Sequence, residues 1–112
     1  MLCSCEQREI LDINIEGDVA ADPLWCIHCG CNLDIEAMPI SNEVKRELIK
    51  WASEYGSWID WDLDEVLPRG IDMETEHNRQ GEILFERLKQ ELGGRYNFKY
   101  TSSTMGRRYA SN

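Results

Sequence analysis

Apolar and polar residues alternate in three short segments, a pattern typical of strands that are buried on one face. These segments are ILDINI at 10–15, an acidic stretch that begins at residue 57 and ends before Pro68, and RYNFKY at 95–100. In the last segment an aromatic residue occupies every second position. The pattern predicts three extended segments, and Gly17 marks the turn that follows the first.

Two longer segments have the three-and-four spacing of amphipathic helices. The first, residues 42–55, follows the N-cap residue Ser41 and stops before Gly56. The second runs from about residue 73 to residue 92, places leucines on one stripe and ends at a Gly-Gly pair. Gly81 lies inside it, where glycine costs about 1 kcal/mol relative to alanine. Gly81 therefore indicates either close packing or a kink.

Strands and helices in this order predict an α+β fold, in which two amphipathic helices pack on a small antiparallel sheet beside an N-terminal module that carries the cysteines. With 112 residues, the chain is long enough for one domain with its own core. We expect a single domain over residues 1–105. It comprises a cysteine-bearing module, residues 1–40, and an α/β body, residues 41–105. The small polar and basic residues at 106–112 predict a flexible tail.

All five cysteines lie before residue 32, and their number is odd. The chain has no apolar run long enough to cross a membrane, and its N-terminus lacks the basic and apolar regions of a signal peptide. These features predict a cytoplasmic protein. Cysteines in that compartment are usually reduced, so clustered cysteines favour metal binding over structural disulfides. A thiol redox pair and cysteines without a ligand are the alternatives.

The motif CIHCG at 26–30 has the CxxCG form, in which two thiolates converge on one metal ion and a glycine turns the backbone. It resembles the knuckle of zinc-ribbon-like proteins. The resemblance covers residues 3–33, where the N-terminal pair is CSC rather than CxxC. We expect His28, between the knuckle cysteines, to point away from the metal. Four thiolates would leave no coordination position for water, so the expected role is structural. The predicted Zn²⁺ ligands are Cys3, Cys5, Cys26 and Cys29, with Cys31 as the alternate.

Acidic residues outnumber basic ones by 21 to 12, which gives a net charge of −9 at pH 7. This charge repels a nucleic-acid backbone, so direct nucleic-acid binding is disfavoured and a protein partner with a basic surface fits better. Acids interleaved with tryptophans are typical of binding hot spots against arginine-rich partners. The predicted partner-binding residues are Trp58, Asp60, Trp61, Asp62, Asp64 and Glu65. We also expect at least one of the two tryptophans to belong to the core.

The chain contains no nucleophile elbow, phosphate-binding loop or dinucleotide fingerprint. The sequence therefore favours a non-enzymatic, zinc-stabilised protein that binds another protein, for example an inhibitor, immunity or antitoxin protein. Two alternatives stay open. Glu74 and His77, at positions i and i+3, fit a metal-dependent nuclease or hydrolase of HNH-like type. Arg107 and Arg108 fit a zinc-finger regulator that contacts DNA through its basic tail.

Overall fold

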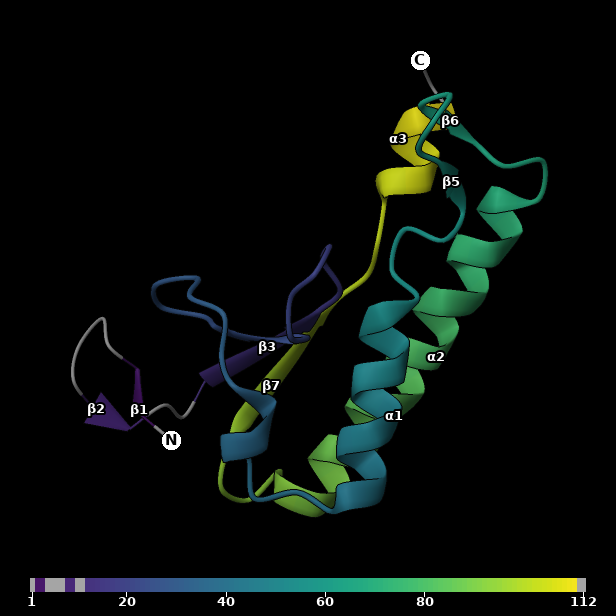
Figure 1. Ribbon diagram of the computed structural model, residues 1–112. Coiled ribbons are helices and arrows are strands. Elements are labelled where there is room, and N and C mark those ends of the chain that lie inside the picture. Colours follow the sequence, from purple (N-terminus) through teal and green to yellow (C-terminus); the bar gives the residue numbers. More distant parts are fainter. Residues whose placement is uncertain (1, 4–7, 10–11, 111–112) are drawn as a thin grey trace.

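Two long helices pack together and against a small sheet (Figure 1). The computed structural model describes residues 2–3, 8–9 and 12–110. No helix within these ranges is long and apolar enough to cross a lipid bilayer. In chain order the elements are β1 (Leu2–Cys3), β2 (Arg8–Glu9), β3 (Asp12–Glu16), β4 (Leu24–Cys26), the 3-10 helix η1 (Ile35–Ala37), α1 (Asn42–Ser53), β5 (Ile59–Asp60), β6 (Glu65–Val66), α2 (Gly70–Leu92), β7 (Asn97–Thr101) and α3 (Met105–Ala110).

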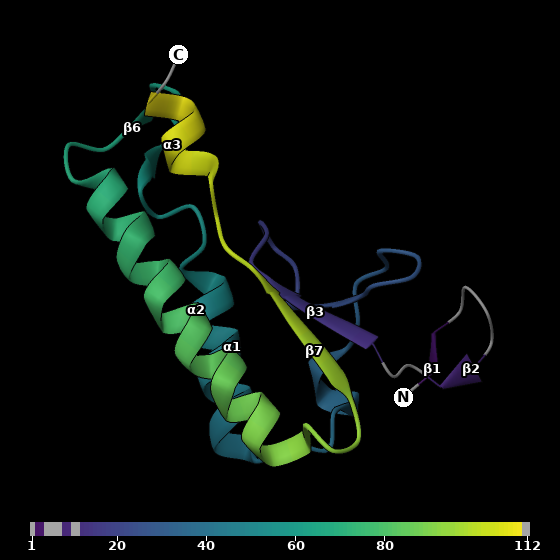
Figure 2. The ribbon, with the colours of Figure 1, turned by 180° about the vertical axis from the view of Figure 1, so that it is seen from behind.

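The central sheet has the strand order β4-β3-β7 and is mixed. Strand β4 runs antiparallel to β3, with Cys26 opposite Ile13, whereas β7 runs parallel to β3, with Phe98 opposite Ile13. The predicted α+β class is confirmed, but the predicted antiparallel arrangement is wrong for β7. Helix α2 ends beside the start of β7 and so returns the chain to the end of the sheet at which β3 begins (Figure 2). A strand that follows such a crossover is parallel.

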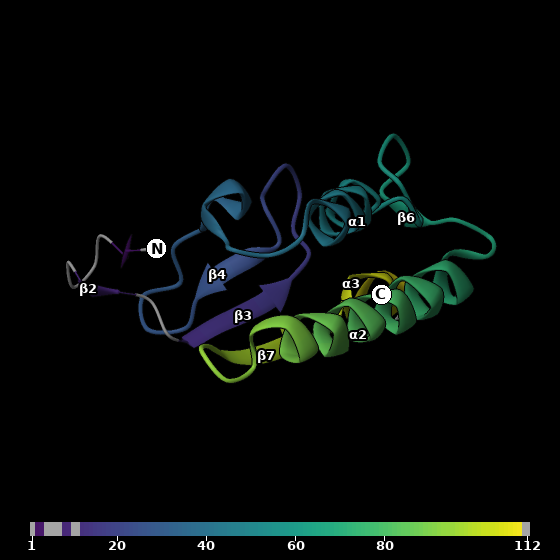
Figure 3. The same ribbon diagram turned by 90° about the horizontal axis from the view of Figure 1, so that it is seen from below.

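The main core lies between this sheet and the helices, with α1 and α2 on the same side of the strands (Figure 3). Ile13 and Ile15 of β3 are fully buried and the residues that alternate with them are half-buried, as predicted from ILDINI. Residues 10 and 11 of that segment lie outside the described ranges. The helices contribute Val44, Leu48, Trp51, Leu84 and Leu88 to the core.

Both predicted helices form. Helix α1 begins as predicted, because the Ser41 Oγ accepts a hydrogen bond from the Val44 N–H over 3.3 Å. It ends two residues earlier than predicted, and α2 begins three residues earlier. Helix α2 runs unbroken through Gly81, where a Cβ atom would lie 2.7 Å from the Trp51 ring and 2.6 Å from the Tyr100 hydroxyl. Gly81 therefore permits close packing of α2 on α1 and β7.

The acidic stretch after residue 57 is not one extended strand. Instead, β5 and β6 pair as an antiparallel hairpin of two residues on each side. The Asp60 Oδ1 accepts hydrogen bonds from the backbone N–H groups of Asp62 and Leu63, each over 3.1 Å. An aspartate that bonds its own backbone in this way bends the chain. The alternating pattern alone does not indicate such a bond, so it predicted a longer strand.

The C-terminal residues differ from the flexible tail predicted at 106–112, because most of them form α3; the last two lie outside the described ranges. The buried Glu74 carboxylate holds this helix. It accepts hydrogen bonds of 2.7 Å from the Gly106 N–H, the Ser103 hydroxyl and the Arg107 guanidinium. Local composition could not reveal this anchor, because the partners lie about thirty positions apart in the sequence.

Candidate functional site

The turn after β4 brings three cysteines together. The Gly30 N–H donates a 2.8 Å hydrogen bond to the Cys26 carbonyl, and the Cys26 N–H donates a 3.0 Å bond to the Cys31 carbonyl. Gly30 has a φ of 75°, a left-handed conformation that glycine adopts without steric cost. The Sγ atoms of Cys26, Cys29 and Cys31, which form the cysteine cluster, lie within 4.8 Å of one another. Such a cluster could hold a metal ion.

The cysteine cluster contains two of the predicted zinc ligands and the predicted alternate. The Cys31 Sγ atom lies as close to the other two sulfur atoms as they lie to each other, within 4.8 Å, so Cys31 is as suitable a ligand as Cys26 and Cys29. The sequence did not indicate this equivalence. Of the N-terminal pair, Cys5 lies outside the described residues, and only the backbone of Cys3, in β1, is described. A contribution from Cys3 or Cys5 therefore stays a prediction.

His28 is not part of the cysteine cluster. Its Nε2 atom lies 2.8 Å from the Asp12 Oδ2 atom on β3, and the Asn97 side chain donates to the other Asp12 oxygen over 3.0 Å. The hydrogen bonds from Asn97 and His28 lower the pKa of Asp12. His28 thus ties the cysteine turn to the start of β3, in agreement with the prediction that it points away from the cysteines.

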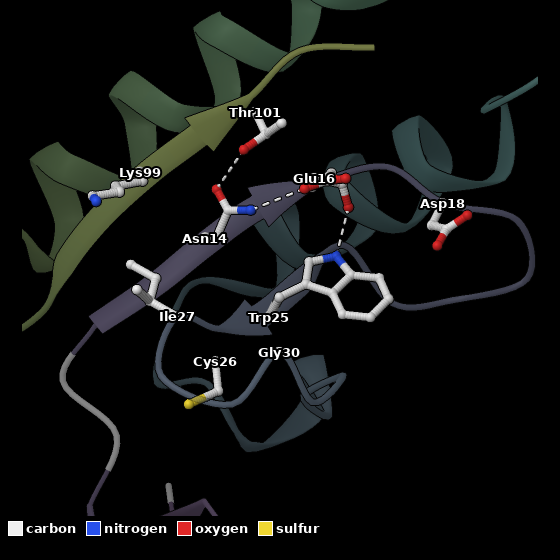
Figure 4. A pocket seen from close by; sticks show the side chains of 9 residues that line it. All are labelled: Asn14, Glu16, Asp18, Trp25, Cys26, Ile27, Gly30, Lys99 and Thr101. Atoms are coloured by element: carbon white, nitrogen blue, oxygen red, sulfur yellow. Dashed lines mark hydrogen bonds between the residues drawn. The ribbon is translucent and has the colours of Figure 1, made fainter. Parts of the chain in front are cut away.

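An open pocket of about 400 Å³ borders the cysteine cluster on the polar face of the sheet (Figure 4). The Trp25 indole donates to the Glu16 carbonyl over 2.9 Å, and the Asn14 side chain bonds both Glu16 and Thr101. Cys26 lines the same pocket. Most of these polar groups form hydrogen bonds with one another, so the lining of the pocket is ordered. Its edge is formed by Cys26 of the cysteine cluster.

The β5–β6 hairpin carries the exposed part of the predicted partner surface. We define the acidic tip as residues 60–65. Trp61 and Leu63 in the acidic tip are 54% and 66% exposed, respectively. The exposed acids beside them are Asp62, Asp64 and Glu65, whereas Asp60 is half-buried and holds the turn. The acidic tip therefore offers apolar contact area surrounded by negative charge.

Trp58 lies in the interior instead. It is 1% exposed and packs edge-on against Tyr55, with ring centroids 5.5 Å apart, and against the His77 ring at 5.0 Å. The structure thus removes Trp58 from the predicted contact surface, because it lies before the hairpin, on the side that faces α2. The expectation that at least one tryptophan of this segment belongs to the core is confirmed.

Helix α3 supports the acidic tip. The Tyr109 ring meets the Trp61 ring edge to face, with centroids 6.3 Å apart. A hydrogen bond to Asp64 raises the pKa of Tyr109. The Trp61 Nε1 atom also donates to the Gly56 carbonyl over 3.1 Å. These contacts fix the exposed indole. The partner-binding residues predicted from the sequence include neither Tyr109 nor Leu63, and only the position of Leu63 between the acids could have indicated a role.

The structure does not bring Glu74 and His77 together as a metal site. The Glu74 carboxylate is fully buried and occupied by the segment that leads into α3. His77 stacks on Trp51, with ring centroids 4.5 Å apart and 8° between the planes. Burial lowers the pKa of His77 to about 4, although the Glu74 charge opposes this shift. Arg107, which was considered for DNA contact, donates to Glu74 instead.

Comparison with protein families accounts for most of the chain. A family model described as "Serratia CdiI immunity protein-like" matches residues 11–103. The matched region contains the central sheet, both long helices, the cysteine cluster and the acidic tip. No curated protein matches the chain. Because the matched family is not a zinc-ribbon family, the resemblance of residues 3–33 to zinc-ribbon-like proteins is limited to the cysteine motif.

Proposed function

Because this chain belongs to the family of Serratia CdiI immunity protein-like proteins, we propose that it binds one toxin protein and neutralises it. An immunity protein acts by covering its toxin and needs no reaction of its own, so the proposal includes no enzymatic activity. The family match over residues 11–103 is the observation that carries it. Glu74 holds the segment that leads into α3, and His77 stacks on Trp51. These contacts favour an immunity protein over a hydrolase that would use both residues as metal ligands.

We place the toxin contact at the acidic tip. Binding hot spots commonly combine an aromatic anchor with a surrounding polar rim, and here Trp61 is the exposed aromatic residue among acids. The net charge of −9 favours a toxin with a basic surface. Proteins that act on nucleic acids present such surfaces. For the same electrostatic reason, we propose a protein rather than a nucleic acid as the partner.

Co-expression tests the function itself. The polypeptide encoded next to this gene is expressed in a bacterial host, alone and together with this chain, and growth is followed. We expect growth arrest that this chain relieves, and a complex of the two polypeptides in size-exclusion chromatography. Arrest that persists while both proteins are soluble would contradict the proposal for that toxin.

A surface variant then tests the contact. The combined substitutions Trp61→Ala, Asp62→Asn and Glu65→Gln should weaken binding of that toxin about 30-fold or more, the effect of losing one hot spot of about 2 kcal/mol. Asp60 is left unchanged because its carboxylate holds the turn. The measurement is the Kd by isothermal titration calorimetry.

The matched control removes the same kinds of side chain from the exposed surface of α2. It combines Ile83→Ala, Glu82→Gln and Glu86→Gln, where Ile83 is 48% exposed. Its net charge equals that of the acidic-tip variant. If only the acidic-tip variant loses toxin affinity, the loss reflects a direct contact and not a general effect of charge. Equal affinity of both variants and the unmodified chain would exclude the acidic tip as the contact.

We also propose that the metal held by the cysteine cluster is zinc and that its role is structural. All donors in the cluster are sulfur atoms, and thiolates are the ligands of closed zinc sites. A closed site stabilises the fold but supplies no coordination position for a substrate.

A further inference from the structure

Within the described residues, the central sheet has one covered edge and one open edge. Beside β4 the chain folds back: the Leu33 N–H donates to the Leu24 carbonyl over 2.8 Å, and Trp25 forms a bridge with Asn32. On the opposite side of the sheet, β7 lies in front of β3 in Figure 2, and no other element is drawn in front of β7. The outer side of β7 is therefore an edge that can accept a further strand.

The pairing of β3 determines which backbone groups of β7 lie at the open edge. Asp12 and Glu16, at the two ends of β3, form backbone hydrogen bonds with the segment that contains β4. Successive residues of a strand point their N–H and C=O groups to opposite sides, so those of Ile13 point toward β7. In a parallel pair the residue opposite points its own groups away, and Phe98 lies opposite Ile13. The N–H and C=O groups of Phe98, and of Tyr100 two residues later, therefore point outward from the sheet.

Nothing else in the described part of the chain bonds these outward groups. No hydrogen bond from a helix, a loop or a side chain reaches the backbone of Phe98 or Tyr100. The side chain of Tyr100 is held at the core instead. Its ring stacks on Phe85, with centroids 6.1 Å apart, and its hydroxyl donates to the Asn78 carbonyl over 2.9 Å. Strand β7 is thus a fixed template that offers backbone donors and acceptors to a partner.

We propose that an extended segment of the basic toxin pairs with the outer side of β7 and adds a strand to the central sheet, a contact that rests on the proposed function. Charge favours the toxin over a second copy of this chain, because each copy carries a net charge of −9. Antiparallel pairing of two copies centred on Lys99 would also place two lysines opposite each other. The pocket on the polar face of the sheet, which adjoins β7, is lined by Glu16 and Asp18 and by one base, Lys99 (Figure 4). These acids attract a basic segment.

The open edge is also continuous with the acidic tip. Residues 102–104 lead from β7 directly into α3, whose Tyr109 ring meets the Trp61 ring. The connection from Thr101 to Met105 spans at most about 13 Å, and α3 adds about 9 Å along its axis. A standard interface covers about 800 Å² on each partner, a patch roughly 30 Å across. A single toxin molecule can therefore contact both the acidic tip and β7.

Amide hydrogen exchange of the full chain, followed residue by residue by NMR, tests the edge. In the chain alone, the amides of Phe98 and Tyr100 should exchange at least about 100-fold faster than those of Lys99 and Thr101, whose N–H groups face β3. Binding of the toxin used in the co-expression test should slow exchange at Phe98 and Tyr100 at least about tenfold.

The exchange rates separate the edge contact from the proposed function. Protection of Phe98 and Tyr100 in the chain alone would overturn the edge contact, and protection that rises with chain concentration would assign the edge to a second copy. Fast exchange at both amides within a toxin complex would also overturn it, while the proposed function would stand. A toxin that this chain neither binds nor neutralises would contradict the proposed function, and the edge contact with it.

Two substitutions at one position separate the backbone group from the side chain. Phe98→Pro removes the outward N–H, a change that edge strands tolerate, whereas Phe98→Ala keeps the N–H and loses the same ring. Isothermal titration calorimetry should show that Phe98→Pro binds the toxin about fivefold or more weakly than Phe98→Ala, the effect of one lost hydrogen bond. Equal affinities of the two variants would contradict pairing at β7. If Phe98→Pro does not fold, the exchange measurement decides the question, because it uses the unmodified chain.

Discussion

The imidazole of His77 is enclosed by the rings of Trp51, Tyr55 and Trp58. Its Nε2 atom is buried without a hydrogen-bond partner in the part of the chain that the structure describes. A protonated imidazole would be costly there, because neither ring stacking nor the Glu74 charge replaces the lost hydration. At the residue scale, therefore, His77 acts as a neutral aromatic side chain of the core.

This environment makes stability depend on pH. The pKa of His77 is about 4 in the folded state, against an ordinary value of 6.5 for the unfolded chain. Between these values the unfolded state binds more protons, so the free energy of unfolding falls as the pH falls from about 6.5 to about 4. We expect His77→Phe to remove this contribution while keeping the stacking on Trp51. Urea unfolding at several pH values measures the slope.

The chain contains one other histidine, which supplies the control. His28→Ala, at an exposed position, should retain the loss of stability caused by His77. If the unmodified chain and His77→Phe lose stability equally over this pH range, the burial of a neutral His77 does not contribute to the pH dependence.

Helix α2 connects the functional regions of the molecule at the scale of elements. It packs on α1 and β7 through the position of Gly81, and through Glu74 it anchors α3, which in turn supports the acidic tip. The spacing of apolar residues predicted the helix and which of its faces is buried. It did not predict which polar residue is buried, because a glutamate at position 74 is indistinguishable from a surface residue until its partners are known.

The close packing at Gly81 leads to a prediction. Gly81→Ala places a Cβ atom within 3 Å of the rings of Trp51 and Tyr100. Overpacking costs about 1–3 kcal/mol, against a gain of about 1 kcal/mol in helix propensity, so we expect a net loss of stability of up to about 2 kcal/mol. Gly94→Ala is the control, because nothing lies within 4 Å of its added Cβ atom. Chemical denaturation compares them, and a stabilised Gly81→Ala variant would contradict the packing argument.

For the molecule as a whole, the excess of negative charge acts beyond any single contact. A net charge of −9 attracts a basic partner over a distance of about one Debye length, roughly 10 Å at 0.1 M salt. The exposed acids of the acidic tip concentrate part of this charge around Trp61 and Leu63. Steering of this kind affects the rate of association more than the rate of dissociation.

Salt should therefore slow the formation of the proposed toxin complex. When sodium chloride is raised from about 0.05 M to about 0.5 M, we expect the association rate constant to fall about tenfold or more, with a smaller change in the dissociation rate constant. Surface plasmon resonance measures both constants. An association rate that does not change with salt would show that the acidic surface does not steer the toxin.

The candidate site could be predicted from the sequence only in part. CIHCGC predicted a turn that could hold a metal ion, because ligand spacing is a local property. That Cys31 joins Cys26 and Cys29 in the cysteine cluster became evident only from the fold of residues 26–31. Likewise, the acidic tip could be recognised from its composition. Alternation placed both tryptophans in one strand, whereas the Asp60 side chain bends the backbone and separates a buried Trp58 from an exposed Trp61.

The sequence by itself determined the α+β class, the two helices, the alternation in β3 and β7, the acidic charge and the clustering of cysteines. These follow from local spacing and composition, which a chain carries before it folds. Tertiary structure decided the parallel pairing of β7, the burial of Trp58, Glu74 and His77, and the ordering of α3. Each of these depends on contacts between residues far apart in the sequence, whose free energy exists only once the chain has folded.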